Sequence, residues 1–422
     1  MPKRKFAPAD QQNSETNACP ALLPSSTSNL GMSTSSQARE FRVTTPRDAN
    51  SLTDGVLLAT PPVGGADTNQ NLHQQSRQVI LPWLGFGTYR LGKDQARQAT
   101  FQALKCGYRS IDTAFIYGGE KTETLVGEAI QQALDENIIA DRSDVFITTK
   151  HWRKYHGYEA TLECLELSLK RLGVDYIDLW LMHWPGPAWK TMNREKEHTS
   201  EDPWYYAATD QADMVQLRAE TWRAMEDAYR QGKVRAIGVS NMTVKHLENL
   251  KRTSKLWPPA VNQVELHPLH PQSDLLKYCK QEGIVVQAYA SLGGQDMGKD
   301  SWKSLIGSPS KSVKKKKEKI DLIHAEPVTE LASLKGMTPA QVLLRWGLEQ
   351  ECVLIPKTTS KERLSENAAI FRFEMTPQEV AALHEKLLRR VQENNPEVSS
   401  SRLETLTRLC WRTDPLRLLD FE

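Results

Sequence analysis

Three kinds of signal are missing from this sequence, and each absence excludes a class of protein. No uninterrupted apolar run approaches the roughly 18 residues of a transmembrane helix, and the basic N-terminus, residues 1–5, is not followed by the apolar stretch of a secretory signal. The 6 cysteines include no CxxC pair, so neither a metal site nor a disulfide framework is expected. We therefore expect a cytoplasmic protein, with a nuclear location left open by the cluster Lys3, Arg4 and Lys5.

An excess of charge of one sign is missing as well. The chain carries 54 Lys and Arg against 52 Asp and Glu, for a formal net charge of +2. This balance argues against a chain-wide contact with nucleic acid or with a membrane surface. No GxGxxG loop precedes a helix, so a Rossmann-type dinucleotide site is not predicted either. The partner that remains is a small molecule.

Large apolar side chains are scarce in residues 1–75, which are rich in Ser, Thr, Pro, Asn and Gln. Such a segment cannot bury enough apolar surface to offset its ordering entropy, and we expect it to be disordered. The pattern changes near Gln78, where short apolar runs begin to alternate with helical periodicity. A folded domain is therefore predicted over residues 76–395.

Eight short apolar runs in this domain are predicted to be β-strands: Trp83–Gly87, Arg109–Thr113, Val145–Thr149, Tyr176–Met182, Val234–Val239, Ala260–Val264, Ile284–Ala288 and Cys352–Ile355. Amphipathic stretches lie between them, and in the clearest one, 160–172, leucines recur at helical spacing. Strand–helix alternation repeated eight times predicts an α/β fold, a closed parallel (β/α)8 TIM barrel.

Two connections are too long to be simple turns. One covers about 185–215 after the fourth strand, and the other covers about 292–327 after the seventh strand. The second contains four consecutive lysines at 314–317, which we interpret as a solvated insertion, with a polyanion contact or an import signal as the alternative. A further helix over 376–391 precedes a C-terminal tail, 396–422, that is expected to pack near the mouth of the barrel.

Polar side chains stand where nearly every predicted strand ends, and barrels of this type build their active sites there. Four of them would form a proton-transfer set if they met: Asp112, Tyr117, Lys150 and His183. The Lys150 ammonium would pair with Asp112 and lower the phenol pKa of Tyr117, and His183 would add a hydrogen bond. Singly, each of these residues is more simply a cap or a solvated loop residue, but the joint pattern favours a site.

Six segments form an ordered set of motifs between about residues 79 and 395: Gly107–Tyr117, Ile147–Trp152, Leu181–Pro185, Ala236–Asn241, Ala260–Glu265, and Ile355–Thr358 followed by Arg363, Glu366 and Asn367. In order and in spacing this set resembles the aldo-keto reductases. The resemblance implies an enzyme, an NADP(H)-dependent oxidoreductase that reduces aldehydes or ketones to alcohols. It also implies a monomer.

The resemblance assigns a role to each residue of the set. Tyr117 would donate a proton to the carbonyl oxygen as hydride arrives from the nicotinamide of NADPH, Lys150 with Asp112 would make that phenol more acidic, and His183 would orient the carbonyl. The implied cofactor contacts are Thr88, Ser240, Asn241 and Gln263 with Tyr289 at the nicotinamide, Lys357, Thr358 and Arg363 at a 2′-phosphate, and Glu366 and Asn367 at the adenine. The implied substrate contacts are Tyr89, Ile116, Trp152, His183 and Trp184.

One departure from the family pattern lies beside Tyr117, where the stretch 118–126 is about three residues longer than usual. Two other functions stay open. One is an NADPH-binding, redox-sensing regulatory or accessory subunit with little turnover. The other is a barrel isomerase or lyase without a nicotinamide, against which Lys357, Thr358 and Arg363 argue.

Overall fold

The computed structural model describes residues 41–60, 78–92, 95–186, 211–294 and 321–393, together with Pro396 and Thr407. The expectations for the lysine run at 314–317 and for most of the tail lie outside these residues. The bounds of the folded domain and of the tail stay predictions.

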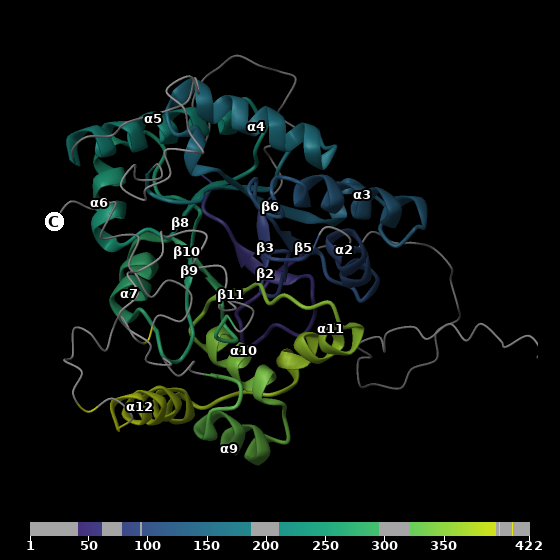
Figure 1. Cartoon of the computed structure of the whole chain (residues 1–422), viewed down its shortest axis with the longest axis vertical. Helices are drawn as coiled ribbons and strands as arrows, with labels where there is room; N and C mark the ends of the chain where they lie inside the picture. Colours follow the sequence, from purple (N-terminus) through teal and green to yellow (C-terminus); the bar gives the residue numbers. More distant parts are fainter. Residues whose placement is uncertain are drawn as a thin grey trace, which may run out of the picture.

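Eight strands form one parallel sheet that closes into a barrel, which confirms the predicted fold (Figure 1). Leu84 bridges Leu354 in parallel, and the backbone N–H of Gly85 donates to the Leu354 carbonyl over 2.8 Å, which closes the ring. The strands follow one another in chain order: β4 (Phe86–Gly87), β5 (Ser110–Asp112), β6 (Phe146–His151), β7 (Leu179–Met182), β8 (Ile237–Ser240), β9 (Val261–Glu265), β10 (Val285–Tyr289) and β11 (Val353–Leu354). Each overlaps one of the predicted runs.

Helices surround the barrel (Figure 1): α2 (Gln95–Lys105), α3 (Thr122–Asp135), α4 (Tyr158–Leu172), α5 (Gln211–Arg230), α6 (Val244–Thr253), α7 (Ser273–Glu282), α9 (Glu326–Lys335), α10 (Pro339–Glu349), α11 (Lys361–Ala368) and α12 (Pro377–Glu393). Their ends follow local chemistry. The Thr338 hydroxyl caps α10 ahead of a proline, and Gly173, at φ 65°, ends α4 in the left-handed region. Helix α9 has a weak amphipathic pattern, because its buried residues are Pro327, Val328 and Ala332 and its Leu334 faces solvent.

One continuous apolar core joins the barrel to its helices. Trp180, Trp222 and Trp346 are the largest apolar side chains that it buries completely. Burial of a large apolar side chain contributes on the order of 2–3 kcal/mol. The strand ends that carry polar residues are thereby held on a rigid frame.

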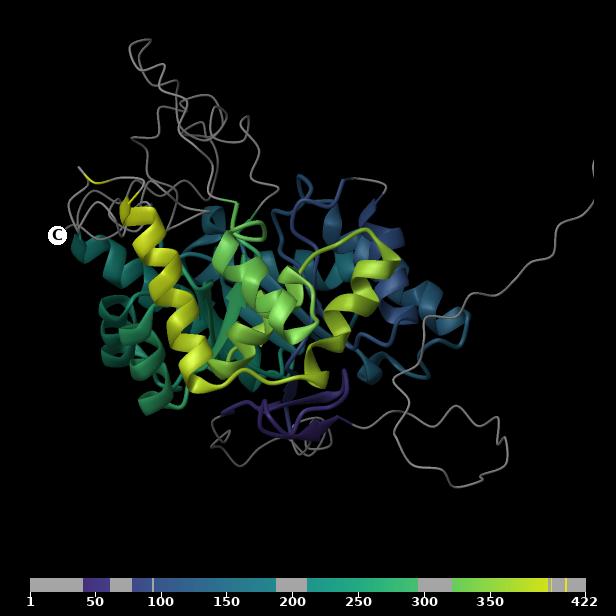
Figure 2. The same cartoon turned by 90° about the horizontal axis from the view of Figure 1, so that it is seen from below.

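Residues 41–60 are ordered, so the expectation of disorder over residues 1–75 is wrong for this part. Strands β1 (Arg42–Val43) and β2 (Asp54–Leu57) form a three-stranded sheet with β3 (Ile80–Pro82), and this sheet covers one end of the barrel (Figure 2). Three of the segment's apolar residues, Ala49, Leu52 and Leu58, are buried against the barrel core and hold the segment there.

A buried carboxylate organises this small sheet. Asp54 accepts hydrogen bonds from Arg42 Nε over 2.8 Å and from the backbone N–H groups of Asn50 and Ser51 over 2.8 and 3.0 Å. The Trp83 indole then ties the segment to the barrel by donating to the Thr44 carbonyl over 3.3 Å. Hydrogen bonds to one buried carboxylate thus hold together a segment that has few large apolar residues.

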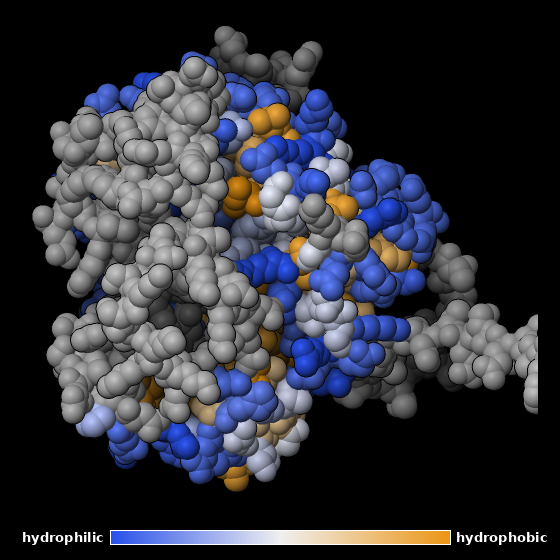
Figure 3. Space-filling model, in the orientation of Figure 1, coloured by the Kyte–Doolittle hydropathy of each residue, from blue (hydrophilic) through white to orange (hydrophobic). Residues whose placement is uncertain are grey.

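The described surface over α2 and α3 is mainly hydrophilic, with separate hydrophobic spots (Figure 3). The large apolar side chains exposed among the described residues are Val43, Leu57, Tyr89 and Leu334. In the part of the chain that the structure describes, no helix combines the length and apolar character needed to cross a membrane.

Candidate active site

The structure brings the four predicted proton-transfer residues together at one end of the barrel. Asp112 is the last residue of β5, Lys150 lies near the end of β6, and His183 directly follows β7. Tyr117 stands in the turn after β5. Parallel strands end on the same rim, so residues far apart in the sequence meet there.

The Lys150 ammonium is the centre of the hydrogen-bond network. Lys150 Nζ donates to Asp112 Oδ1 and to the Thr113 carbonyl, each over 2.7 Å, and to the Tyr117 hydroxyl over 3.3 Å. Lys150 is fully buried and Asp112 nearly so. A charge-assisted pair that is closed off from solvent fixes the direction in which the ammonium points at the phenol.

Aromatic rings surround the phenol and the imidazole. The ring centroid of Tyr117 lies 4.9 Å from that of Tyr89 and 5.9 Å from that of His183. The His183 ring lies in turn 5.8 Å from Trp152 and 6.2 Å from Trp184, with which it is stacked. Four of the five predicted substrate residues therefore adjoin Tyr117 directly or through His183. The fifth, Ile116, is half-buried next to Tyr117 in the chain.

Burial sets the direction of most pKa shifts in this group. Desolvation raises the pKa of Asp112 and lowers that of Lys150, and in both cases their ion pair opposes the shift. Desolvation also lowers the pKa of His183 well below its ordinary value, and the charge of Lys150 adds to this effect, so the imidazole is neutral near pH 7.

The expected effect on Tyr117 is wrong in direction. Burial, followed by the nearby charge of Asp112 and by Tyr89, raises the pKa of the Tyr117 phenol well above its ordinary value. The main physical reason is that burial removes the water that would solvate a phenolate, and the negative charge of Asp112 adds to this effect. The phenol is therefore protonated at neutral pH, as a proton donor must be.

The predicted nicotinamide residues form a second network on the adjacent strands. Ser240 Oγ donates to the Gln263 carbonyl over 2.8 Å, and Asn241 Nδ2 donates to the His183 carbonyl over 2.9 Å. The Tyr289 hydroxyl donates to Asn241 Oδ1 over 2.7 Å. Asn241 holds a left-handed backbone at φ 59°, a conformation that asparagine adopts more readily than most residues.

This network is joined to the first one. Gln263 Nε2 donates to Asp112 Oδ2 over 2.7 Å, and Thr88 Oγ1 donates to the Asp112 carbonyl over 2.9 Å. The side chains predicted for a cofactor and those predicted for proton transfer thus share one buried carboxylate.

The predicted phosphate and adenine residues follow β11 and lie in α11. Thr358 and Asn367 are buried, whereas Arg363 is exposed on the first turn of the helix. The backbone N–H of Arg363 donates to Ser360 Oγ, which caps the helix. Glu366 also has a structural role, since its carboxylate accepts a hydrogen bond over 2.5 Å from the hydroxyl of Thr338, the residue that caps α10.

Two buried polar residues near the site are not among the predictions. Gln287 accepts from Gln263 Nε2 over 2.7 Å, and Glu123 accepts from Thr149 Oγ1 over 2.7 Å. Gln287 interrupts an apolar strand, which is a signal that the sequence does carry. Glu123 has no such signal, because polar residues are ordinary in the first turn of a helix.

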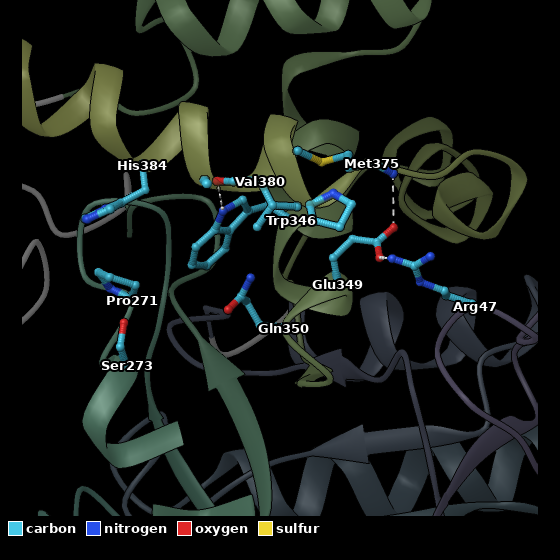
Figure 4. Close-up of a pocket in the computed structure, with 11 residues that line it drawn as sticks. Arg47, Pro271, Ser273, Trp346, Glu349, Gln350, Met375, Val380 and His384 are labelled. Atoms are coloured by element: carbon cyan, nitrogen blue, oxygen red, sulfur yellow. Dashed lines mark hydrogen bonds and ion pairs between the residues drawn. The ribbon is translucent and has the colours of Figure 1, made fainter. Parts of the chain in front are cut away.

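A hollow of about 310 Å³ lies apart from these residues, beside α12 and the end of α10 (Figure 4). Its walls include the Trp346 indole, which donates to the Val380 carbonyl over 3.1 Å, and the half-buried Glu349, whose carboxylate lies 3.4 Å from the Arg47 guanidinium. No predicted site residue lines it. It is therefore separate from the chemistry at the strand ends.

Comparison with known proteins gives one consistent family. Residues 83–388 match the model of the aldo/keto reductase family. Glyoxal reductase of Bacillus subtilis is 36% identical over 304 residues, which cover 72% of this chain and 87% of that protein. Glycerol 2-dehydrogenase (NADP(+)) of Saccharomyces cerevisiae is 35% identical over 298 residues, which cover 69% and 83%.

A solved structure extends the match to three dimensions. The Bombyx mori aldo-keto reductase in complex with NADP aligns with a TM-score of 0.58 at 30% identity, over 74% of this chain and 91% of that one. The family match covers the whole barrel, including every strand that carries a residue of the site. The chain therefore belongs to the aldo/keto reductase family of oxidoreductases.

Proposed function

We propose that this protein reduces aldehydes or ketones to alcohols with NADPH, and that Tyr117 is the proton donor. The observation that carries the proposal is the buried Asp112–Lys150 pair with its ammonium 3.3 Å from the Tyr117 hydroxyl. A phenol held against an ammonium can release a proton to a carbonyl oxygen, because the developing phenolate gains a charge-assisted hydrogen bond.

The side chains near this pair suit a nicotinamide cofactor. Gln287 Nε2 is buried and has no hydrogen-bond partner among the residues that the structure describes. Ser240, Asn241 and Gln263 offer hydroxyl and amide groups of the kind that bind a carboxamide. At α11, Lys357 and Arg363 would hold a 2′-phosphate, with Arg363 as a fork and Lys357 as a point charge. NADPH would supply the hydride when bound.

The remaining steps belong to the chain. His183, neutral because of its lowered pKa, would donate one ring N–H hydrogen bond to the carbonyl oxygen and so orient it. Tyr117 would give its hydroxyl proton to that oxygen, and Lys150 would stabilise the phenolate left behind. The rings of Tyr89, Trp152 and Trp184 would exclude water from the transfer. General acid catalysis of this kind typically contributes about 10²- to 10⁴-fold.

The test is NADPH oxidation, followed by its absorbance, with purified protein and a panel of carbonyl compounds: glyoxal, short aliphatic aldehydes, aromatic aldehydes, aldoses and simple ketones. We expect turnover with at least one class and a weaker rate with NADH. Tight NADPH binding without turnover on any member would replace this proposal with that of a regulatory subunit. The assay therefore separates the two readings of the same site.

A further inference from the structure

The turn that carries Tyr117 into α3 has an unfavourable backbone. Three consecutive residues, Gly118, Gly119 and Glu120, adopt the left-handed region at φ 60°, 65° and 72°. Glycine accepts this conformation readily, whereas glutamate does not. A side chain held there persists only when its surroundings determine the conformation. In this turn, the Glu120 carboxylate is paired with one arginine, Arg171.

Arg171, in the last turn of α4, contacts both ends of the turn. Its NH2 atom lies 2.8 Å from Glu120 Oε2, and its NH1 atom lies 3.6 Å from Glu123 Oε2 in the first turn of α3. Its guanidinium carbon lies 4.0 Å from the centroid of the Phe115 ring. Phe115 precedes Tyr117 by two residues, so one guanidinium holds the chain on both sides of the phenol.

The backbone links these contacts to Tyr117 itself. The Tyr117 carbonyl accepts hydrogen bonds from the N–H groups of Glu120 over 3.1 Å and of Thr122 over 3.3 Å. Glu120 and Thr122 therefore both hold the peptide that carries the phenol. A shift of Glu120 would reach Tyr117 through its own backbone hydrogen bond.

The same contacts reach the strand that carries Lys150. Glu123 is fully buried, and its Oε1 accepts from the hydroxyl of Thr149, the residue before Lys150, over 2.7 Å. The backbone N–H of Phe115 donates to the Lys150 carbonyl over 3.2 Å. Arg171 is thus connected through Glu123 and Phe115 to Lys150, and through Glu120 to Tyr117.

From these contacts we propose that Arg171 is a positioning residue, which holds the lengthened turn so that the Tyr117 hydroxyl stays in reach of Lys150. The inference rests on the proposed role of Tyr117. Arg171 touches neither substrate nor cofactor; it acts through Glu120, Glu123 and Phe115. Rates of oriented proton transfer are sensitive to displacements on the order of 1 Å, which can cost about 100-fold. Loss of the guanidinium should therefore lower the rate of the chemical step.

The test compares Arg171→Met with Arg171→Lys and with Lys170→Met. Methionine is an unbranched side chain that can still pack on Phe115 but removes the charge and both ion pairs, lysine restores the charge, and Lys170 is an exposed cation in the same helix turn. The amplitude of tryptophan fluorescence quenching by NADPH measures the concentration of folded protein in each sample. We expect kcat per folded molecule to fall about 10- to 100-fold in Arg171→Met with little change in KM. Arg171→Lys should recover part of this loss, and Lys170→Met should match the wild type.

A solvent deuterium isotope effect gives a readout that a merely structural role would not move. It should increase in Arg171→Met, because proton transfer from a displaced phenol limits the rate more strongly. If Arg171→Met does not fold, Glu120→Ala is the second variant, because the Glu120 side chain is 41% exposed. We expect it to show a smaller fall in kcat and a smaller rise in the isotope effect.

Two results would overturn the inference. One is a wild-type kcat in folded Arg171→Met, and the other is a lowered kcat with an unchanged isotope effect. Both leave the role of Tyr117 intact if Tyr117→Phe is inactive. Turnover by Tyr117→Phe would instead refute the proposed function, whatever Arg171 does.

Discussion

Gln263 Nε2 lies 2.7 Å from Asp112 Oδ2, so the carboxylate that pairs with Lys150 is also bonded to a strand on the far side of the barrel sheet. Its other oxygen, Oδ1, accepts from Lys150 over 2.7 Å. Both oxygens of this buried carboxylate are therefore used. One consequence is that a change at Asp112 should disturb proton transfer and the proposed nicotinamide contacts together.

Asp112→Asn tests this coupling. An asparagine amide offers one acceptor to two donors, so either Lys150 or Gln263 loses its partner, and the ammonium loses its counter-charge. We expect kcat to fall about 100-fold or more and NADPH affinity to fall by a smaller factor. Steady-state kinetics and fluorescence titration with NADPH measure the two effects on the same sample. If only kcat falls and NADPH affinity stays the same, the hydrogen bond between Gln263 and Asp112 does not affect cofactor binding.

Tyr117→Phe isolates the proton donor. The variant removes one oxygen and leaves the ring against Tyr89 and His183, so the packing of the site is kept. We expect NADPH binding close to that of the wild type and a loss of turnover of about 100- to 10,000-fold. Tyr89→Phe is the matched control, since it removes a hydroxyl from the adjacent ring. Comparable losses in both variants would argue against a special role for the Tyr117 hydroxyl.

Arg363→Ala tests the choice between the two nicotinamide cofactors. An exposed arginine beside a 2′-phosphate should contribute a charge-assisted hydrogen bond, and its loss should weaken NADPH binding about 10- to 100-fold. NADH lacks the phosphate, so its affinity should change little. Fluorescence titrations with both cofactors measure the ratio.

Arg372→Ala serves as the control for Arg363→Ala, because Arg372 is also exposed and follows α11 in the chain. It should leave both affinities unchanged. An equal loss of NADPH and NADH affinity in Arg363→Ala would contradict the 2′-phosphate assignment.

Asp54→Ala tests whether the N-terminal sheet stabilises the barrel. The substitution removes the carboxylate that accepts from the part-buried N–H groups of Asn50 and Ser51 and from the Arg42 guanidinium, which keeps its hydrogen bond to Asn50 Oδ1. We expect the free energy of unfolding to fall by about 2–3 kcal/mol, measured by chemical denaturation. Asp48→Ala, at an exposed carboxylate in the same segment, should have little effect. Equal stabilities of the two variants would mean that the sheet opens independently of the barrel.

The parts of the fold that were predictable have strong local signals. The eight strands are short apolar runs that end in polar residues, and Asp112, Lys150 and His183 stand at those ends because parallel strands share a rim. Residues 41–60 give no such signal, since Asp54 organises them through hydrogen bonds that only the folded chain reveals. The Tyr117 pKa was predicted in the wrong direction for a related reason, because composition and spacing do not show how completely a group is desolvated.

His151 illustrates the same limit and leads to a prediction about pH. It follows Lys150 in β6, is fully buried, and packs its ring 4.7 Å from that of His156 and 6.3 Å from that of Trp180. Burial lowers the pKa of His151 to about 4, against 6.5 for the unfolded group, and a backbone contact at Tyr155 opposes this shift. Between these two values the unfolded state binds the proton more readily than the folded state.

The stability that neutral His151 contributes is therefore fully present above pH 6.5 and is lost as the pH falls toward 4. Lowering the pH from 7 to 5 should cost the wild type about 2 kcal/mol of unfolding free energy through this residue. His156 and His183, whose pKa values are also lowered, add to the loss. In His151→Leu the loss should shrink by about that amount, as measured by urea unfolding at pH 5, 6 and 7.

The matched control is His324→Leu, at an exposed histidine, which should keep the wild-type slope of unfolding free energy against pH. If His151→Leu also keeps that slope, His151 accepts a proton in the folded state as easily as in the unfolded one, and its environment is more polar than its burial implies.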